Sequence, residues 1–364
     1  MKNNLYTATM SKQNKAEIVT NAEIIYVGID AHLEKYVVVR QVDGLSPQPA
    51  QTFRKETTLC NWISKQQQQA KRVVCCYEAG PLGFTLHRVL MAMGVTCHVV
   101  APKRWAENED RVKTDKRDAR ILCQRLESYE RGNRTVLNVV RVPSKEEEYF
   151  RALGRQREAL KKEVMRNAQR ARGQALLHGI RLKGKWWSAK RWEQLLLENE
   201  PLFNLLKPLR KIILVIEEEC IELTKQLEKD SVAQKDRPKG LGALTWRMIK
   251  GEVCDFRRFN NRREVASYTG LCPSESSSGS KRRQGFVTKH GNRMLRHYLV
   301  EAVWRLIKWQ PNWYAWKKWQ DQFSKASGGK RKQIVVALAR TLAIDMWRIY
   351  TGQTTLENLG MDPA

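Results

Sequence analysis

Short apolar runs rich in β-branched residues predict the strands in the first third of the chain. Ile24 to Asp30 and Arg72 to Glu78 share one design, in which a run typical of a buried strand closes on a single acid. Tyr36 to Arg40 follows as the hairpin partner of the first run. Gln51 to Arg54 predicts a third strand, and Val95 to Val100 a further one. Two strands are therefore expected to carry a carboxylate at their C-terminal end.

Segments with helical spacing separate these strands. Leu59 to Gln69 and Phe84 to Met93 have apolar residues at helical intervals, and Gly94 ends the second of them. Lys113 to Ala119 predicts another helix after the last strand. Three strands followed by alternating helices and strands indicate an α/β domain with a central mixed sheet, which we assign to residues 22–140.

A long, highly charged helical region and a second domain follow. Residues 141–235 predict a coiled-coil-like linker, because apolar residues alternate steps of four and three at Leu209, Ile213, Ile216, Cys220, Leu223 and Leu227. Such a stripe pairs equally well with a helix of the same chain or of another chain. Residues 236–364 predict a mostly α-helical C-terminal domain. Residues 1–21 lack apolar periodicity and predict a loosely ordered tail.

The charge of the chain narrows the class of partner. Lysine and arginine number 66 of the 364 residues against 38 aspartates and glutamates, which gives a formal net charge of +28. Such an excess indicates a polyanion. A cationic membrane protein is the rival, but the sequence has no apolar run of about 18 residues and no signal-peptide core at its N-terminus. Nucleic acid is the favoured partner, and no membrane is expected.

Two smaller patterns add to this description. The eight cysteines include no Cys-x-x-Cys pair and no nearby histidine at zinc-ligand spacing, which favours reduced, buried thiols. Lys183 to Trp192 interleaves three tryptophans with positive charge. That mixture suits phosphate contacts and base stacking, and it equally suits tryptophans packed under solvated lysines.

Four acids form the first candidate site. Asp115 and Asp118 lie three residues apart and share one helix face, and Asp30 and Glu78 end two strands. Carboxylates from different elements can hold one or two Mg²⁺ ions against a scissile phosphate. The pair on the helix alone is also explained by a solvated face. Lys113, Lys116 and Arg117 beside the pair are candidate nucleic-acid contacts.

A serine-rich stretch from Gly270 to Ser280 forms the second candidate site. Serine-rich loops are commonly flexible connectors between helices. This loop is followed by a run of basic and polar residues, from which we select as nucleic-acid contacts Lys281, Arg282, Arg283, Lys289, Asn292, Arg293 and Arg296. A serine hydroxyl becomes a nucleophile when a base, a metal or a strong positive field favours its alkoxide.

The segments "IIYVGID", "CCYEAGPLGF" and "RVKTDKRDA" resemble the acidic tetrad of the RuvC-like, ribonuclease-H-type domain of insertion sequence 110 family transposases, including the 1111 branch. "GLCPSESSSGSKRRQGFVTKHGNRMLR" resembles the C-terminal transposase domain of that family, whose Ser-Gly pair carries the proposed nucleophile. The pair is Ser278-Gly279 here. The adjacent Ser276 and Ser277 leave this register open by a residue or two.

The resemblance implies a recombinase guided by a bridge RNA. Under it, Asp30, Glu78, Asp115 and Asp118 bind Mg²⁺, and Ser278 forms a covalent phosphoserine link to DNA. Its partners are donor and target DNA, a structured guide RNA and further copies of the chain in a dimer or tetramer. It implies a nucleoid-associated protein in the cytoplasm of a bacterium or archaeon.

Two other functions remain open at this point. The acidic residues alone also fit a metal-dependent nuclease that cuts DNA junctions, in which water attacks and the serine loop merely contacts DNA. The charge alone also fits a non-catalytic RNA-binding protein.

Overall fold

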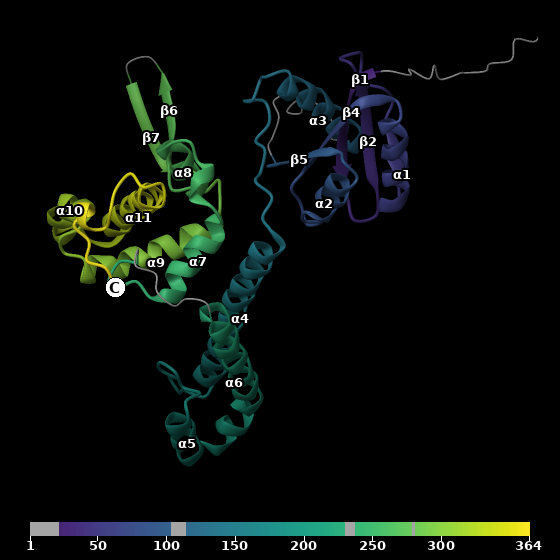
Figure 1. The fold of residues 1–364 in the computed structure, drawn as a ribbon. Helices are drawn as coiled ribbons and strands as arrows, with labels where there is room; N and C mark the ends of the chain where they lie inside the picture. The colour runs from purple at the N-terminus through teal and green to yellow at the C-terminus, as the bar shows by residue number, and fades with distance from the viewer. Residues whose placement is uncertain (1–21, 103–113, 230–236, 279–280) are drawn as a thin grey trace, which may run out of the picture. The chain divides into compact units, whose positions relative to one another are not determined.

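The computed structural model describes residues 22–102, 114–229, 237–278 and 281–364, without the side chains of residues 276–283. The chain forms two compact units, residues 1–142 and residues 143–364, which we describe separately (Figure 1). In the described part of the chain, no helix has a stretch long and apolar enough to span a bilayer.

The first unit is an α/β domain. Its strands are β1 (Ala22–Ala31), β2 (Tyr36–Val42), β3 (Gln51–Phe53), β4 (Ala70–Glu78) and β5 (Thr96–Val100), and its helices are α1 (Glu56–Gln67), α2 (Thr85–Ala92) and α3 (Asp115–Glu130). The strand order is β3-β2-β1-β4-β5. The central strand β1 runs antiparallel to β2 and parallel to β4. The predicted mixed sheet, and the order of its strands and helices, are confirmed.

Alternation along β1 separates the two faces of this sheet. Ile25, Val27 and Ile29 are buried in one core together with residues of α1 and α2. Tyr26 points to the other face, where its core neighbours include Leu122 of α3. Since successive side chains of a strand point to opposite faces, residues of even number in β1 face α3.

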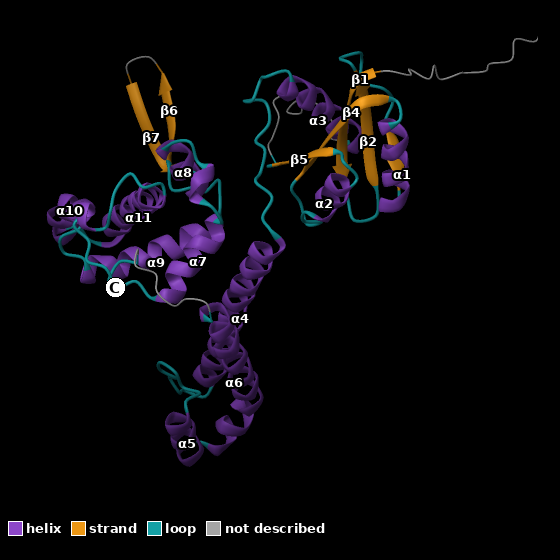
Figure 2. Ribbon diagram, in the orientation of Figure 1, coloured by secondary structure: helices purple, strands orange, loops and turns teal. Residues whose placement is uncertain are grey.

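The second unit is largely helical. It contains α4 (Lys145–Leu177), α5 (Ala189–Glu198), α6 (Glu200–Glu228), α7 (Ala243–Val253), α8 (Arg262–Thr269), α9 (Arg293–Trp309), α10 (Tyr314–Lys325) and α11 (Gly328–Tyr350), with 3-10 turns at Phe256–Arg258 and Glu357–Leu359. Between α8 and α9, β6 (Pro273–Ser278) and β7 (Lys281–Val287) pair as a two-stranded antiparallel sheet, drawn in orange in Figure 2. The predicted helical C-terminal half is confirmed.

The long helices α4 and α6 pack against each other within the chain. Ile213 of the predicted stripe is fully buried between them, and Leu223 is also buried. Trp186, Trp187 and Trp192 are buried in the same core. The aromatic stretch therefore supplies packing rather than exposed rings for base stacking.

The serine-rich stretch differs from the predicted loop, because its backbone forms a strand. Pro273 lies opposite Val287, and Ser278 lies opposite Lys281. The partner strand begins with three basic residues and ends with Phe286 and Val287, and its pairing with β6 is irregular between Pro273 and Glu275. Serines have a weak strand preference of their own, so this strand depends on pairing with the segment that follows it in the hairpin.

Candidate functional site

The first two acids lie at neighbouring strand ends of the α/β domain. Ile29 of β1 is in register with Tyr77 of β4, so Asp30 and Glu78 are the next residues of two adjacent parallel strands. By the alternation along each strand, both face α3. The sheet therefore brings two carboxylates from distant parts of the sequence to one edge.

A glycine allows α3 to approach this edge closely. A Cβ on Gly28 would lie 2.3 Å from the backbone oxygen of Ala119 and 2.4 Å from the backbone nitrogen of Cys123. No side chain fits in that space. The Cys123 thiol also lies 3.4 Å from the carbonyl oxygen of Tyr26. Backbone-to-backbone packing thus fixes α3 on β1.

The first turn of α3 carries the other two acids. The helix begins at Asp115, and Thr114 precedes it with an extended backbone. Asp115 and Asp118 are one turn apart at the N-terminal end, where the helix dipole favours negative charge. The close packing at Gly28 carries this turn toward the end of β1.

Three donor groups meet at this point. Single donor atoms of Asp30, His32 and Asp115 all lie within 4.8 Å of one another. His32 Nε2 lies 3.0 Å from Asp30 Oδ2 and 3.6 Å from Asp115 Oδ1. Lys35 Nζ lies 2.5 Å from the second oxygen of Asp115. We call Asp30, His32 and Asp115 the acidic group.

The two carboxyl groups have opposite electrostatic environments. Burial raises the pKa of Asp30, and the charges of Asp115 and Asp118 raise it further against the lowering effect of His32. The hydrogen bond from Lys35 lowers the pKa of Asp115. Positive charge near this group therefore stabilises the ionised carboxylates.

The acidic group fits a divalent cation. An ion about 2.1 Å from its ligands places adjacent ligands about 3.0 Å apart and opposite ligands about 4.2 Å apart. The 3.0 and 3.6 Å separations in this group lie within that range. Carboxylate oxygens and an imidazole nitrogen are ligands of such ions. Among the described residues, Glu78 and Asp118 are not part of the tight group, although Asp118 acts electrostatically on Asp30.

Sequence reasoning missed His32 and Lys35. Both follow Asp30 in the turn between β1 and β2, and residues two apart in an extended segment share a face. The spacing from Asp30 to His32 is therefore a signal that the sequence contained. The close approach at Gly28 was also missed, since it depends on helix residues more than ninety positions away in the sequence.

The serine hairpin, which we define as β6 and β7, ends in the described residues at Ser278 and Lys281. Gly279 lies outside the described residues, and so do the side chains of Ser276, Ser277 and Ser278. Phe286 on β7 is 88% exposed, so the hairpin is not covered by its own unit there. The serines therefore lie toward the end of a hairpin that projects from the helical core (Figure 1).

A buried polar network holds the base of this hairpin. Glu252 of α7 is 1% exposed and accepts two hydrogen bonds from Arg155 of α4, at 3.0 and 2.9 Å. Asn292 donates to the same carboxylate at 2.7 Å and caps the N-terminus of α9. Tyr268 donates to the backbone oxygen of Glu252 at 2.9 Å. Glu252 thus joins α4 to both segments that flank the hairpin, through its carboxylate to Arg155 and Asn292 and through its backbone oxygen to Tyr268.

Glycine lets these two segments run close together. Gly291 has φ +123°, and a Cβ on it would lie 2.4 Å from the carbonyl oxygen of Tyr268. The Thr288 amide donates to the Cys272 carbonyl at 2.8 Å. These contacts continue the pairing of β6 and β7 toward the helices.

The candidate nucleic-acid contacts lie in different settings. Lys116, Lys289 and Arg293 are exposed, whereas Asn292 faces Glu252 and Arg296 donates to the Thr269 carbonyl at 3.0 Å. Arg117 is partly buried. The predicted contacts outside the described residues or side chains are Lys113, Lys281, Arg282 and Arg283.

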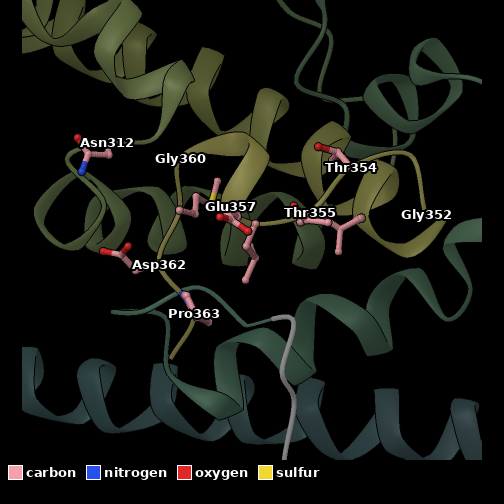
Figure 3. Close-up of a pocket in the computed structure, with 11 residues that line it drawn as sticks. Asn312, Gly352, Thr354, Thr355, Glu357, Gly360, Asp362 and Pro363 are labelled. Carbon is pink, nitrogen blue, oxygen red and sulfur yellow. The ribbon is translucent and has the colours of Figure 1, made fainter.

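A separate hollow lies elsewhere in the second unit. It has a volume of about 780 Å³ and is bounded by the end of α11 and the last residues of the chain (Figure 3). Its polar lining includes Asn312, Thr355, Glu357 and Asp362. The described lining contains none of the acids or serines selected above, so the hollow does not change the assignment of the site.

Comparison with known proteins identifies the family. The model of a transposase domain of the DEDD type from IS110 elements matches residues 27–180, and the model described as transposase IS116/IS110/IS902 family matches residues 237–318. The y4rJ protein of Sinorhizobium fredii is 31% identical over 78% of each chain. The chain belongs to the IS110 family of transposases.

Two further relatives of this transposase are named for their elements. The transposase for insertion sequence element IS1533 of Leptospira borgpetersenii is 29% identical over 77% of this chain and 85% of its own. The transposase for IS1111A of Coxiella burnetii is 25% identical over 74% of this chain and 75% of its own. The protein is an insertion-sequence transposase, and its DEDD domain implies the use of a divalent metal.

Proposed function

We propose that this transposase cuts and rejoins DNA with a Mg²⁺-binding tetrad and a serine nucleophile, and that a structured guide RNA selects its sites. The observation that carries the proposal is the meeting of Asp30 and Asp115 within reach of one cation, in a domain of the DEDD family. Glu78 at the adjacent strand end and Asp118 one helical turn on complete the proposed ligand set.

The tetrad prepares the phosphate for attack. A bound metal ion supplies charge screening at the scissile phosphate. Asp30 and Asp115 would hold that ion, and the close packing of α3 on β1 keeps their separation small. Rigid placement matters because a ligand set that must rearrange when the ion binds loses part of the binding free energy to that rearrangement.

The serine performs the exchange. The Ser278 oxygen forms a bond to phosphorus, and the bond from that phosphorus to a deoxyribose oxygen breaks. The serine proton passes to solvent, and the leaving deoxyribose oxygen takes up a proton from solvent to become a hydroxyl. The hydroxyl of a second strand then attacks the phosphoserine and releases the enzyme. Each step replaces one phosphoester bond by another, so rejoining requires no ATP.

The net charge of +28 supports binding of both DNA and RNA. Exposed Lys116, Lys289 and Arg293 are the described candidates for phosphate contacts. We further propose that copies of the chain assemble as a dimer or tetramer on donor and target DNA.

A denaturing gel of the full chain, with its copurified RNA and labelled insertion-sequence ends, tests this function. The expected product is a covalent protein–DNA adduct that disappears in Ser278→Ala, while DNA binding is retained. Ser276→Ala and Ser277→Ala are the matched controls. Free cut ends from Ser278→Ala and from the triple alanine variant would indicate water as the nucleophile. Treatment with ribonuclease before DNA is added should abolish the adduct if RNA guides the reaction.

A further inference from the structure

The four-residue turn between β1 and β2 carries His32 and Lys35, whose side-chain nitrogens lie beside the carboxylates of the acidic group. Residues 32–35 join β1 to β2, and the His32 amide donates to the Lys35 carbonyl at 2.9 Å. The side chains of both residues then reach Asp115 of α3. The turn is short and closed by its own backbone, so it holds both side chains beside the acids.

His32 has the position of a ligand. Its Nε2 lies between two carboxylates from separate elements, 3.0 Å from Asp30 and 3.6 Å from Asp115. The side chain is 47% exposed, so the imidazole is not enclosed by protein. The same nitrogen that contacts both acids is the atom that a shared cation would approach.

We propose that His32 is a nitrogen ligand of the divalent cation and that Lys35 competes with the cation for Asp115. The inference rests on the metal site of the proposed function and adds two residues to it. His32 is expected to strengthen metal binding, because its imidazole nitrogen adds a lone pair. Lys35 is expected to weaken metal binding, because it adds a positive charge.

The nitrogen ligand changes the metal preference. Mg²⁺ binds carboxylates and water, whereas first-row transition metals also accept imidazole. A set of two carboxylates and one histidine therefore favours Mn²⁺ over Mg²⁺. Without the histidine, the remaining carboxylates discriminate less between the two ions.

Lys35 opposes binding by occupying a carboxylate oxygen. Its Nζ lies 2.5 Å from Asp115 Oδ2, an atom that a cation would also use. The ion pair is solvent-exposed, with side-chain exposures of 45% and 38%. Its loss should therefore strengthen metal binding modestly rather than by orders of magnitude.

Electron paramagnetic resonance of Mn²⁺ bound to the full chain tests the role of His32. We expect a ¹⁴N coupling from one imidazole in the natural chain, and its loss in His32→Gln together with a roughly tenfold or greater weakening of Mn²⁺ binding. Mg²⁺ affinity, measured by competition, should change less. His98→Gln is the matched control, because His98 pairs with Glu130 at 3.1 Å and lies outside the acidic group.

The same titration tests Lys35. Lys35→Ala should tighten Mn²⁺ binding roughly twofold to fivefold, the equivalent of one exposed ion pair. Lys71→Ala is the control, since Lys71 also lies 2.5 Å from a carboxylate oxygen, that of Glu23, away from the acidic group. Unchanged or weaker binding by Lys35→Ala would contradict the competition.

The outcomes separate this inference from the function on which it rests. Mn²⁺ binding that Asp30→Asn and Asp115→Asn abolish, without any nitrogen coupling, would overturn the ligand role of His32 and leave the metal site in place. Mn²⁺ binding that is absent, or indifferent to both asparagine variants, would overturn the metal site itself. Nitrogen coupling that persists in His32→Gln would assign the ligand to another histidine.

Discussion

Close packing of backbone on backbone holds the acidic group of the α/β domain in place, whereas buried polar side chains hold the base of the serine hairpin. At the acidic group, the backbone of α3 touches Gly28 with no room for a side chain. At the hairpin, the buried carboxylate of Glu252 receives hydrogen bonds from Arg155 and Asn292. The packing of α3 on β1 should therefore be sensitive to substitutions that add volume, and the base of the hairpin to substitutions that remove a charge.

This difference matches what each region does in the proposed reaction. A metal site needs ligands at fixed separations, and close packing of a helix on a sheet provides them. The hairpin presents serines at the end of two strands, so only its base can fix its direction. Directional hydrogen bonds to one carboxylate define that base more specifically than apolar contacts would.

The largest expected effect is on the acidic residues themselves. Asp115→Asn and Asp118→Asn should each reduce DNA cleavage by about 100-fold or more, because each change removes a negative charge from the proposed metal site. DNA binding at low salt should be retained, since the chain loses only one negative charge. Cleavage assays and filter binding measure the two quantities.

Glu34→Gln is the matched control for these variants, because Glu34 is an exposed acid in the turn beside the acidic group. It should cleave DNA at a rate close to that of the natural chain. Full activity of Asp115→Asn would remove this residue from the proposed ligand set.

The second prediction concerns lost charge at the hairpin base. Glu252→Ala should lower the free energy of unfolding of the second unit by about 2–3 kcal/mol. This loss is smaller than that expected for an ion pair in which both side chains are buried, because Arg155 is 48% exposed. Tryptophan fluorescence during denaturation follows this unit, since of the 12 tryptophans only Trp62 and Trp105 lie within residues 1–142.

Glu163→Ala is the control for this measurement. Glu163 also pairs with an arginine of α4, at 2.6 Å, but both side chains are exposed. Its loss should cost less than about 1 kcal/mol. Equal effects of the two substitutions would show that the buried network does not stabilise the hairpin base.

The third prediction concerns added volume at the acidic group. Gly28→Ala should destabilise the packing of α3 on β1 by about 2 kcal/mol, because the new methyl group meets backbone atoms that cannot rotate away. Faster amide hydrogen exchange in α3, together with weaker Mn²⁺ binding, would be the evidence. Gly80→Ala is the control, because a Cβ there would lie 3.9 Å from its nearest neighbour, the backbone oxygen of Glu78.

The α/β domain was the easier part to predict from the sequence. Two of its strands, β1 and β4, are apolar runs that carry one acid at or next to their C-terminal end, and period-two alternation fixes which face each side chain takes. The positions of Asp30, Glu78 and the pair on α3 follow from local patterns. The distance between Asp30 and Asp115 does not, because it depends on α3 resting on Gly28.

The hairpin and its base were harder, for a physical reason. Serines at 276–278 have little intrinsic preference for a strand, and only pairing with β7 makes one. Asn292 sits in a basic run that suggested contact with nucleic acid, yet its amide is directed at Glu252, forty residues earlier. Contacts of this kind leave no periodic signal in the sequence. The roles of Ser278 and of the basic residues stay predictions.

The smallest expected effect distinguishes geometry from charge at the hairpin base. Arg155 donates Nε and Nη2 to the two oxygens of Glu252, a fork that lysine cannot reproduce. Arg155→Lys keeps the positive charge and loses one of two hydrogen bonds, so we expect a loss of about 1 kcal/mol in the second unit.

Arg166→Lys is its matched control on the same helix. Arg166 contacts both oxygens of Glu163 through one nitrogen, at 2.6 and 2.9 Å, and it is 65% exposed. A lysine can replace a single donor in water, so the expected change is near zero. If Arg155→Lys also leaves the free energy of unfolding unchanged, charge alone holds Glu252, and the hairpin base does not depend on directional hydrogen bonds. A loss confined to Arg155→Lys would show that the two-bond geometry contributes beyond charge.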